Sequence, residues 1–403
     1  MKAAGIVISV GMFLLTAVGL VAIASVGDVQ SLRIHGSPNR LFLLQLGFAC
    51  AGLVLAVAAA RVPPSFWFRR EVVVAAALLA LAGLVAVHVP GLGVANKGSA
   101  RWVRLGPVGV QPSEFVKIAA VLVTAWWVGD PALDKRRFVR SALVPAAWIG
   151  VLVLGLMVEP DLGSTVMLLA VNGAVLFVSG VRLRYLFVLG ALAAVALGVY
   201  VAHDPERLSR ITSVFGGGDR TEQAASAGGR AARDQDAYQL EMGLTAFAAG
   251  GATGVGLGNS LLKHSYLPEN HTDFILAMVG EEMGLAATLP CLLVFFAMAV
   301  AGFRVAFLAE DPRVRLLALG LSLHLCLSGA VNVGVVTGAF PTKGLALPFL
   351  SYGGSNLVAS LVAGGLLLGV AWGTKPRRGR FGDEPEPVPP PRRGEELSLG
   401  WGL

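Results

Sequence analysis

Long apolar stretches recur along this chain of 403 residues and constrain its fold more than any other feature. Most run for about 17 to 25 residues, enough for a helix to cross a hydrocarbon core about 30 Å thick. Charged residues are only 14% of the sequence, against roughly 25% in soluble domains. The sequence therefore predicts an all-α, polytopic integral membrane protein with about ten transmembrane helices. The expected spans are residues 4–25, 41–60, 72–89, 113–128, 142–157, 163–180, 185–202, 273–303, 314–338 and 354–373.

Lysine and arginine gather in alternate gaps between these stretches. Short basic loops stay on the cytoplasmic side of a membrane, so the pattern places both termini in the cytoplasm and the remaining gaps outside. Because these gaps and the tail hold half of the 32 Lys and Arg residues behind the net charge of +7, we expect membrane lipid around the protein and no nucleic acid partner. The basic residues concerned are Arg61, Arg69, Arg70, Lys135, Arg136, Arg137, Arg140, Arg182, Arg184, Arg304, Arg313, Arg315, Lys375, Arg377, Arg378 and Arg380.

Three outer segments are too long to be simple turns, namely residues 90–112, 203–272 and 339–353. Long connections of this kind often carry function. The second one joins the seventh and eighth expected spans, and its part 216–236 is rich in Gly, Ala and charge, which favours partial flexibility. We expect one transmembrane domain over residues 1–374, followed by a disordered cytoplasmic tail over residues 375–403 in which prolines mix with charges.

Charged side chains in or beside the spans are candidates for function, because an ionised group near the bilayer centre costs roughly 2.5–3.5 kcal/mol. Glu114 and Lys117 are three residues apart at the outer start of the fourth span, so a helix places them on one face. They can form a structural ion pair or line a polar cavity. Glu281 and Glu282 lie inside the eighth span, where at least one must face a polar interior.

Two outer motifs place carboxylates beside expected helix starts. Glu159-Pro160-Asp161 separates the fifth and sixth spans, where its carboxylates can cap a helix, bind a cation or hold a basic partner. Thr272 and Asp273 stand where the eighth span begins, and either can act as an N-cap. A carboxylate at the membrane surface is also where a general base for a membrane-anchored substrate must lie.

Residues 341–355 contain two prolines, several glycines and hydroxyl side chains between the last two spans. This composition favours a structured re-entrant loop over a helix. Lys343 in this loop can bind a phosphate group as a point charge.

The motifs also occur in a particular order along the chain. In that order they resemble the signature of the SEDS family (shape, elongation, division and sporulation), and the resemblance extends over roughly residues 4 to 374. Two of the runs, from Pro341 to Gly344 and from Gly280 to Gly284, are more similar to division-type than to elongation-type members, and sporulation members share them. The runs that carry the resemblance are Arg101-Trp102, Gln111 to Lys117, Glu159 to Gly163, Gly254 to Ser260, Leu267 to Phe274, Gly280 to Glu282 and Lys343 to Gly354.

This resemblance implies a bacterial peptidoglycan glycosyltransferase that polymerises lipid II at the outer face of the inner membrane. Undecaprenyl pyrophosphate is then the leaving group. Asp273 matches the essential outer-loop aspartate of the family, and we expect it to be the general base. Glu114 and Lys117 match the charged pair of the family's central cavity. The expected substrate-binding residues are Glu114, Lys117, Arg101, Arg210, Lys343, Glu159, Asp161, His271 and Glu281.

The resemblance also implies partners, which are a class B penicillin-binding transpeptidase and other division proteins at the septum. A divalent cation, Mg or Mn, can assist the departure of pyrophosphate, although the sequence shows no ligand cluster for it. Three alternatives stay open on the sequence alone: a lipid II flippase, since charges in a helix bundle also mark transport paths, an elongation-type polymerase, and a scaffold that recruits division proteins through its tail.

Overall fold

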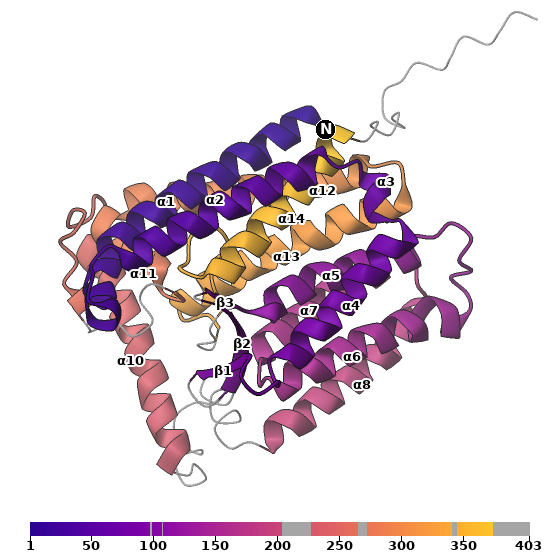
Figure 1. Cartoon of the computed structure of the whole chain (residues 1–403), viewed down its shortest axis with the longest axis horizontal. Coiled ribbons are helices and arrows are strands. Elements are labelled where there is room, and N and C mark those ends of the chain that lie inside the picture. Colours follow the sequence, from indigo (N-terminus) through magenta and orange to yellow (C-terminus); the bar gives the residue numbers. More distant parts are fainter. Residues whose placement is uncertain (97–98, 107, 204–226, 265–271, 341–344, 374–403) are drawn as a thin grey trace, which may run out of the picture.

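The computed structural model describes residues 1–96, 99–106, 108–203, 227–264, 272–340 and 345–373 (Figure 1). Within these residues each of the ten expected spans corresponds to at least one helix. Seven helices are long and apolar enough to cross a membrane, and α4, α5 and α7 have 17 residues each. The polytopic membrane fold predicted from the sequence is confirmed. The helices of the spans are α1 (Lys2–His35), α2 (Arg40–Arg61), α4 (Arg70–Ala86), α5 (Pro112–Val128), α6 (Val144–Val158) preceded by the π-helical turn η1 (Val139–Leu143), α7 (Leu162–Val178), α8 (Leu183–Ala202), α11 (Ile275–Met283), α12 (Leu285–Leu308), α13 (Pro312–Val336) and α14 (Gly354–Gly373).

The eighth expected span differs from the prediction, because it consists of two helices, α11 and α12. They are separated at Gly284, whose φ of +69° is rarely adopted by other residues. A Cβ atom at this position would lie 2.4 Å from the backbone nitrogen of Gly254. The close approach follows from the pairing of the two segments, since the Val255 and Gly256 amides donate to the Glu281 and Glu282 carbonyls at 2.9 and 3.0 Å. The overlong apolar run therefore hides a turn that only glycine permits.

The outer segments contain secondary structure that the sequence did not predict. Residues 90–112 include a three-stranded antiparallel sheet made of β1 (Gly93–Asn96), β2 (Ser99–Leu105) and β3 (Val108–Val110), in the order β1-β2-β3. Helix α10 (Ala227–Gly250) starts inside the part 216–236, whose partial flexibility stays a prediction. The short helices α3 (Pro64–Trp67) and η2 (Leu262–His264) complete the described elements.

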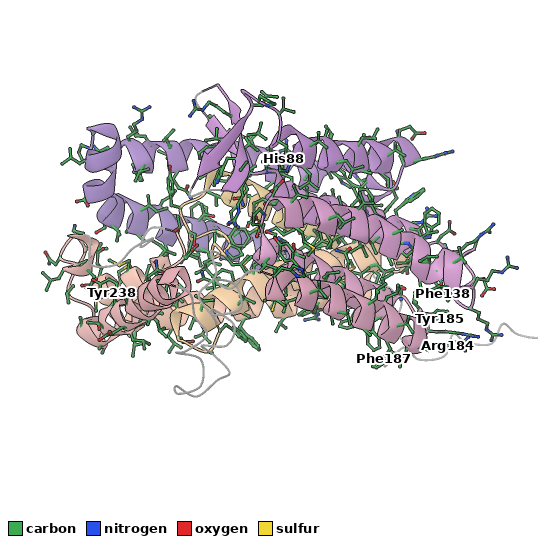
Figure 2. The ribbon with its side chains drawn as sticks, turned by 90° about the horizontal axis from the view of Figure 1, so that it is seen from below. His88, Phe138, Arg184, Tyr185, Phe187 and Tyr238 are labelled. Atoms are coloured by element: carbon green, nitrogen blue, oxygen red, sulfur yellow. The ribbon has the colours of Figure 1, made fainter. Side chains whose placement is uncertain are left out.

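The helices run side by side, and the two ends of the bundle differ in character (Figure 1). One end carries the start of α1, the end of α14, α3 and the connection between α5 and η1. The opposite end carries the sheet, α10 and α11. Among the described residues, the basic residues expected in the cytoplasm lie in or beside the connections at the first end, while those of the tail lie outside the described residues. Figure 2 shows Phe138, Arg184 and Tyr185 together there, while Tyr238 of α10 lies at the opposite end. The ring centroids of Phe138 and Tyr185 are 5.0 Å apart, and Cζ of Arg184 lies 4.9 Å from the centroid of the Tyr185 ring.

Close backbone packing joins the helices of the bundle to one another and to the chain before α14. A Cβ atom on Gly19 of α1 would lie 2.7 Å from the carbonyl oxygen of Leu350, and one on Gly365 of α14 would lie 2.4 Å from that of Ala56 in α2. Small residues allow this approach between membrane helices. The chain between α13 and α14 is therefore pressed directly onto α1, and it forms the centre of the candidate site.

Candidate active site at the sheet end of the bundle

The segment 345–356, which we name the junction segment, connects α13 to α14 and bonds to several other elements. Its residue Ser351 donates its hydroxyl to the Thr272 carbonyl at 2.6 Å and accepts from the Leu347 amide at 2.8 Å. Gln45 of α2 donates to the Ser351 carbonyl at 3.1 Å and accepts from the Gly353 amide at 3.3 Å. The described part of the expected loop, residues 345–355, is therefore structured, and polar side chains from the surrounding elements hold its conformation.

The junction segment also reaches the charged pair of α5. Ser355 accepts from the Gln111 amide at 2.8 Å, and Asn356 donates to Glu114 Oε2 at 3.2 Å. The other oxygen of Glu114 accepts from Lys117 Nζ at 2.8 Å, and both side chains are less than a tenth exposed. The prediction that Glu114 and Lys117 share one helix face is confirmed, and within the described residues they form a buried ion pair with an amide beside it.

Asp273 lies next to the junction segment, directly before α11. The amide group of Asn332 in α13 donates to the Asp273 carbonyl at 2.9 Å and to the Leu345 carbonyl at 2.7 Å. The alternative that Thr272 or Asp273 is the N-cap is wrong, because the N-cap residue of α11 is Phe274, whose side chain makes no capping bond. Asp273 is only partly buried, which leaves it suited to a role in chemistry.

The turn between α6 and α7 brings three more of the expected residues together. The Arg101 guanidinium of β2 donates to the Glu159 and Pro160 carbonyls at 3.0 and 2.6 Å. Asp161 is the N-cap of α7, with its carboxylate accepting from the Ser164 amide at 3.0 Å. Glu159 is fully buried. Burial, followed by the charge of Asp161, raises the pKa of Glu159 to about 8 against the opposing effect of Arg101.

This turn is adjacent to the junction segment as well. A Cβ atom on Gly163 would lie 3.3 Å from the side chain of Leu345, the residue whose carbonyl Asn332 holds. The structure therefore brings Arg101, Glu159 and Asp161 to the same end of the bundle as Asp273 and the Glu114–Lys117 pair.

Glu281 belongs to a separate cluster. Its carboxylate accepts from the Ser260 hydroxyl at 2.5 Å and from the Leu261 amide at 3.0 Å, and its side chain is buried. These bonds fasten the loop before η2 to α11. Lys263 of η2 reaches α1, where its Nζ lies 3.5 Å from Asp28 Oδ2. Substrate binding by Glu281 stays a prediction, while its bonds in the structure hold a loop.

Three expected substrate-binding residues, Arg210, His271 and Lys343, lie outside the described residues. Conversely, the sequence reasoning missed the polar side chains that organise the site. Only a weak signal was available, and only for Gln45 and Asn332, because an amide in an otherwise apolar span needs a partner but the sequence does not show which one. The missed residues are Gln45, Asn332, Ser351, Ser355 and Asn356.

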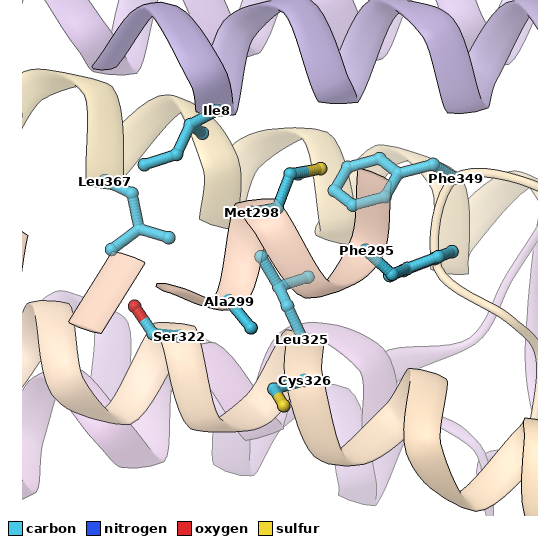
Figure 3. Close-up of a pocket in the computed structure, with 9 residues that line it drawn as sticks. All are labelled: Ile8, Phe295, Met298, Ala299, Ser322, Leu325, Cys326, Phe349 and Leu367. Atoms are coloured by element: carbon cyan, nitrogen blue, oxygen red, sulfur yellow. The ribbon is translucent and has the colours of Figure 1, made fainter. Parts of the chain in front are cut away.

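Two hollows lie away from the charged and amide side chains of this site. A cavity of about 20 Å³ lies under Phe349, between α1, α12, α13 and α14, and Ser322 is its one hydroxyl-bearing lining residue (Figure 3). It has room for about one water. A larger groove of about 610 Å³ runs along α1 and is lined by Leu20, Phe42 and Leu257 among others. Neither hollow is lined by an expected site residue.

A cation site built by the protein needs several ligand side chains close together. Within the described residues, no group of three or more His, Cys, Asp and Glu side chains gathers. The described residues therefore do not by themselves form a protein-built site for Mg or Mn, and we derive no step through a metal ion.

The fold and the site define a class, namely a polytopic integral membrane protein with acidic, basic and amide side chains gathered at one end of its bundle. The family model described as "Cell cycle protein", which covers FtsW, RodA and SpoVE, matches residues 6–375. The chain belongs to this family. The resemblance to SEDS proteins found in the sequence is confirmed.

Curated relatives of this chain are named for an activity. A protein of Trichlorobacter lovleyi named "Probable peptidoglycan glycosyltransferase FtsW" is 38% identical over 364 residues, which are 90% of this chain and 91% of the relative. A protein of the same name from Legionella pneumophila is 34% identical, covering 88% of each chain. Division-type names therefore agree with the motifs that favoured the division type.

Solved structures agree with the fold. One chain from a peptidoglycan synthase complex, reported for its structural coordination of polymerization and crosslinking, is 26% identical with a TM-score of 0.68 and covers 90% of this chain and 95% of that one. The rod shape determining protein RodA of Thermus thermophilus has the same coverage, 24% identity and a TM-score of 0.60, and supports the fold alone.

Proposed function

We propose that this chain is a peptidoglycan glycosyltransferase that polymerises lipid II at the outer face of the cytoplasmic membrane, for septal wall synthesis in cell division. The proposal rests on two observations taken together, the family membership of the chain and the position of Asp273 in the candidate site. The family model covers residues 6–375 and the relatives are named for this activity. The aspartate that matches the family's essential residue lies at the polar end of the bundle and caps no helix.

The reaction joins two lipid-linked sugars. The 4-hydroxyl oxygen of the acceptor attacks the anomeric carbon of the donor, the bond from that carbon to the pyrophosphate oxygen breaks, and undecaprenyl pyrophosphate leaves with the electron pair. Asp273 takes the hydroxyl proton as general base. The transition state has oxocarbenium character, as in glycoside hydrolysis.

The leaving pyrophosphate requires positive charge. Lys117 is paired with Glu114, and Arg101 is bonded to two carbonyl oxygens. Arg210 and Lys343 are therefore the better candidates, and their role rests on the sequence alone. Assistance by a divalent cation, Mg or Mn, stays a prediction.

Orientation and partners complete the proposal. The basic connections at one end of the bundle support a cytoplasmic position for both termini, which leaves the site end outside. A class B penicillin-binding transpeptidase is the proposed partner, supported by the likeness to a chain from a complex that coordinates polymerization and crosslinking. Lipid II, surrounding membrane lipid and other division proteins at the septum are the remaining partners.

The test compares polymerisation with transport. Purified protein, with and without its cognate transpeptidase, is given labelled lipid II in detergent and in liposomes. Glycan strands that depend on the protein support the proposal. Lipid II that crosses the liposome bilayer without any strand formation would contradict it and favour a flippase. Depletion of the protein from cells distinguishes the two wall-synthesis roles. Loss of septa supports a role in division, whereas loss of cell length supports a role in elongation.

A further inference from the structure

Two consecutive backbone carbonyls before α11 are held by side chains from other parts of the chain. Ser351 donates to the Thr272 carbonyl at 2.6 Å, and Asn332 donates to the Asp273 carbonyl at 2.9 Å. Both side chains are almost completely buried, at 1% exposed each. The second amide hydrogen of Asn332 goes to the Leu345 carbonyl at 2.7 Å. One side chain therefore joins the Asp273 segment to the junction segment.

These bonds matter because α11 itself does not fix the position of Asp273. The helix begins at Ile275 and its start has no side-chain cap. The position of a carboxylate depends on the peptide units on either side of its Cα atom, and two of the atoms that define those units are the carbonyls of Thr272 and Asp273. Fixing both carbonyls fixes the direction in which the Asp273 side chain leaves the backbone.

A buried asparagine in an apolar helix can simply satisfy its hydrogen bonds within that helix, and α7 provides an example. Asn172 is also 1% exposed, and its amide donates at 2.9 Å to the Leu168 carbonyl in its own helix. Asn332 behaves differently, since its two bonds cross 59 and 13 residues of sequence. A side chain that only needed a partner would find one within its helix, as Asn172 does.

We propose that Asn332, together with Ser351, is a positioning residue for the reaction, which holds Asp273 in line with the acceptor hydroxyl. The inference rests on the proposed function, because it assigns Asp273 as the general base. It acts through geometry. A displacement of about 1 Å in a reacting group can lower a rate by up to about 100-fold.

The experiment measures lipid II polymerisation by the complex with its transpeptidase. Asn332→Leu removes both amide hydrogens at similar volume, and Ser351→Ala removes the hydroxyl. Both are expected to lower kcat by about 10- to 100-fold with the KM for lipid II unchanged. Asn172→Leu is the matched control, because it removes an equally buried amide, and it is expected to leave kcat within about twofold of wild type. Ser351→Thr keeps a hydroxyl and should recover most of the rate lost in Ser351→Ala.

The outcomes distinguish failure of the positioning role from failure of the proposed function. Equal kcat in Asn332→Leu and Asn172→Leu, or a rise in KM with kcat unchanged, would overturn the positioning role. If Asn332→Leu fails to fold, the Ser351→Ala and Ser351→Thr pair decides by the same criterion. A wild-type complex that makes no glycan at all overturns the proposed function and this inference with it.

Discussion

Two acidic segments at the same end of the bundle, residues 159–161 before α7 and residues 272–273 before α11, are held in the same way, but their aspartates have different roles. In both, a pair of consecutive backbone carbonyls is held from a distance, at Glu159 and Pro160 by Arg101 and before α11 by Ser351 and Asn332. In the first segment the carboxylate of Asp161 caps α7. In the second, α11 has no side-chain cap. The comparison teaches that an aspartate before a helix is a candidate for catalysis when it is not the N-cap of that helix.

The largest expected effect concerns Glu114. Its carboxylate accepts from Lys117 and Asn356, just as the carboxylate of Asp161 accepts from the Ser164 amide. Lys117→Met leaves Glu114 buried without its cation, so the free energy of unfolding should fall by about 3–5 kcal/mol. The melting temperature and the folded fraction in detergent measure this. The double variant Glu114→Gln with Lys117→Met should recover most of the loss.

An exposed ion pair of the same spacing provides the control for that prediction. Asp134 and Arg137 are 3.5 Å apart and more than half exposed. Arg137→Met should change the free energy of unfolding by about 0–1 kcal/mol. Equal losses for Lys117→Met and Arg137→Met would show that the Glu114 pair is not buried in the folded protein.

The second prediction concerns the pH dependence of stability at Glu159. Its pKa is raised to about 8 in the folded protein from 4.5, so between these values the unfolded chain has lost a proton that the folded chain keeps. Stability contributed by the protonated carboxyl is therefore complete below about pH 4.5 and falls as pH rises, by up to about 1.4 kcal/mol per pH unit, until pH 8. Glu159→Gln should remove this slope. Melting temperatures of both proteins at pH 5 to 8 test it, and parallel curves would contradict it.

The third prediction concerns the side chain that holds the first pair of carbonyls. Arg101→Lys replaces a planar fork by a single ammonium group, which cannot reproduce both bonds. We expect a loss of about 1–3 kcal/mol in the free energy of unfolding. Arg104→Lys, on the same strand but exposed, is the control and should lie within about 0.5 kcal/mol of wild type.

The smallest effects should appear at Asp161. Asp161→Ala removes the cap of α7 and should cost about 1 kcal/mol, whereas Asp161→Asn should cost less than about 0.5 kcal/mol because asparagine caps equally well. Thermal unfolding of the two variants measures the difference. A larger loss in Asp161→Asn would mean that its charge, and not its cap, is important.

Much of this architecture was predictable from the sequence, because apolar length and basic loops follow directly from the physics of a bilayer. The fourth and tenth spans agree with α5 and α14 to within one residue. The break at Gly284 was not predictable, since its cause is the contact with Gly254, far from it in the sequence. Helix α10 was missed because its composition is Gly- and Ala-rich with scattered charges, and such a pattern does not reveal a helix without its tertiary contacts.

The candidate site was predicted in part for the same reason. Ionised residues such as Glu114 and Asp273 are conspicuous against an apolar background. Asn332 and Ser351 are not, because Asn332 is a single neutral polar residue in an apolar stretch and Ser351 is one of several hydroxyl-bearing residues in its loop. Their importance comes from bonds to distant segments, and only the folded arrangement reveals those.

The most direct test compares Asp273→Asn with Asp311→Asn in lipid II polymerisation at equal folded amounts of the transpeptidase complex. The two changes are chemically identical, but Asp311 is the N-cap of α13 and lies outside the candidate site. We expect a rate at least about 100-fold below wild type for Asp273→Asn, the usual contribution of a general base, and a rate within about twofold of wild type for Asp311→Asn. Substantial polymerisation by Asp273→Asn, or an equal loss in both variants, would contradict the role of Asp273 as general base.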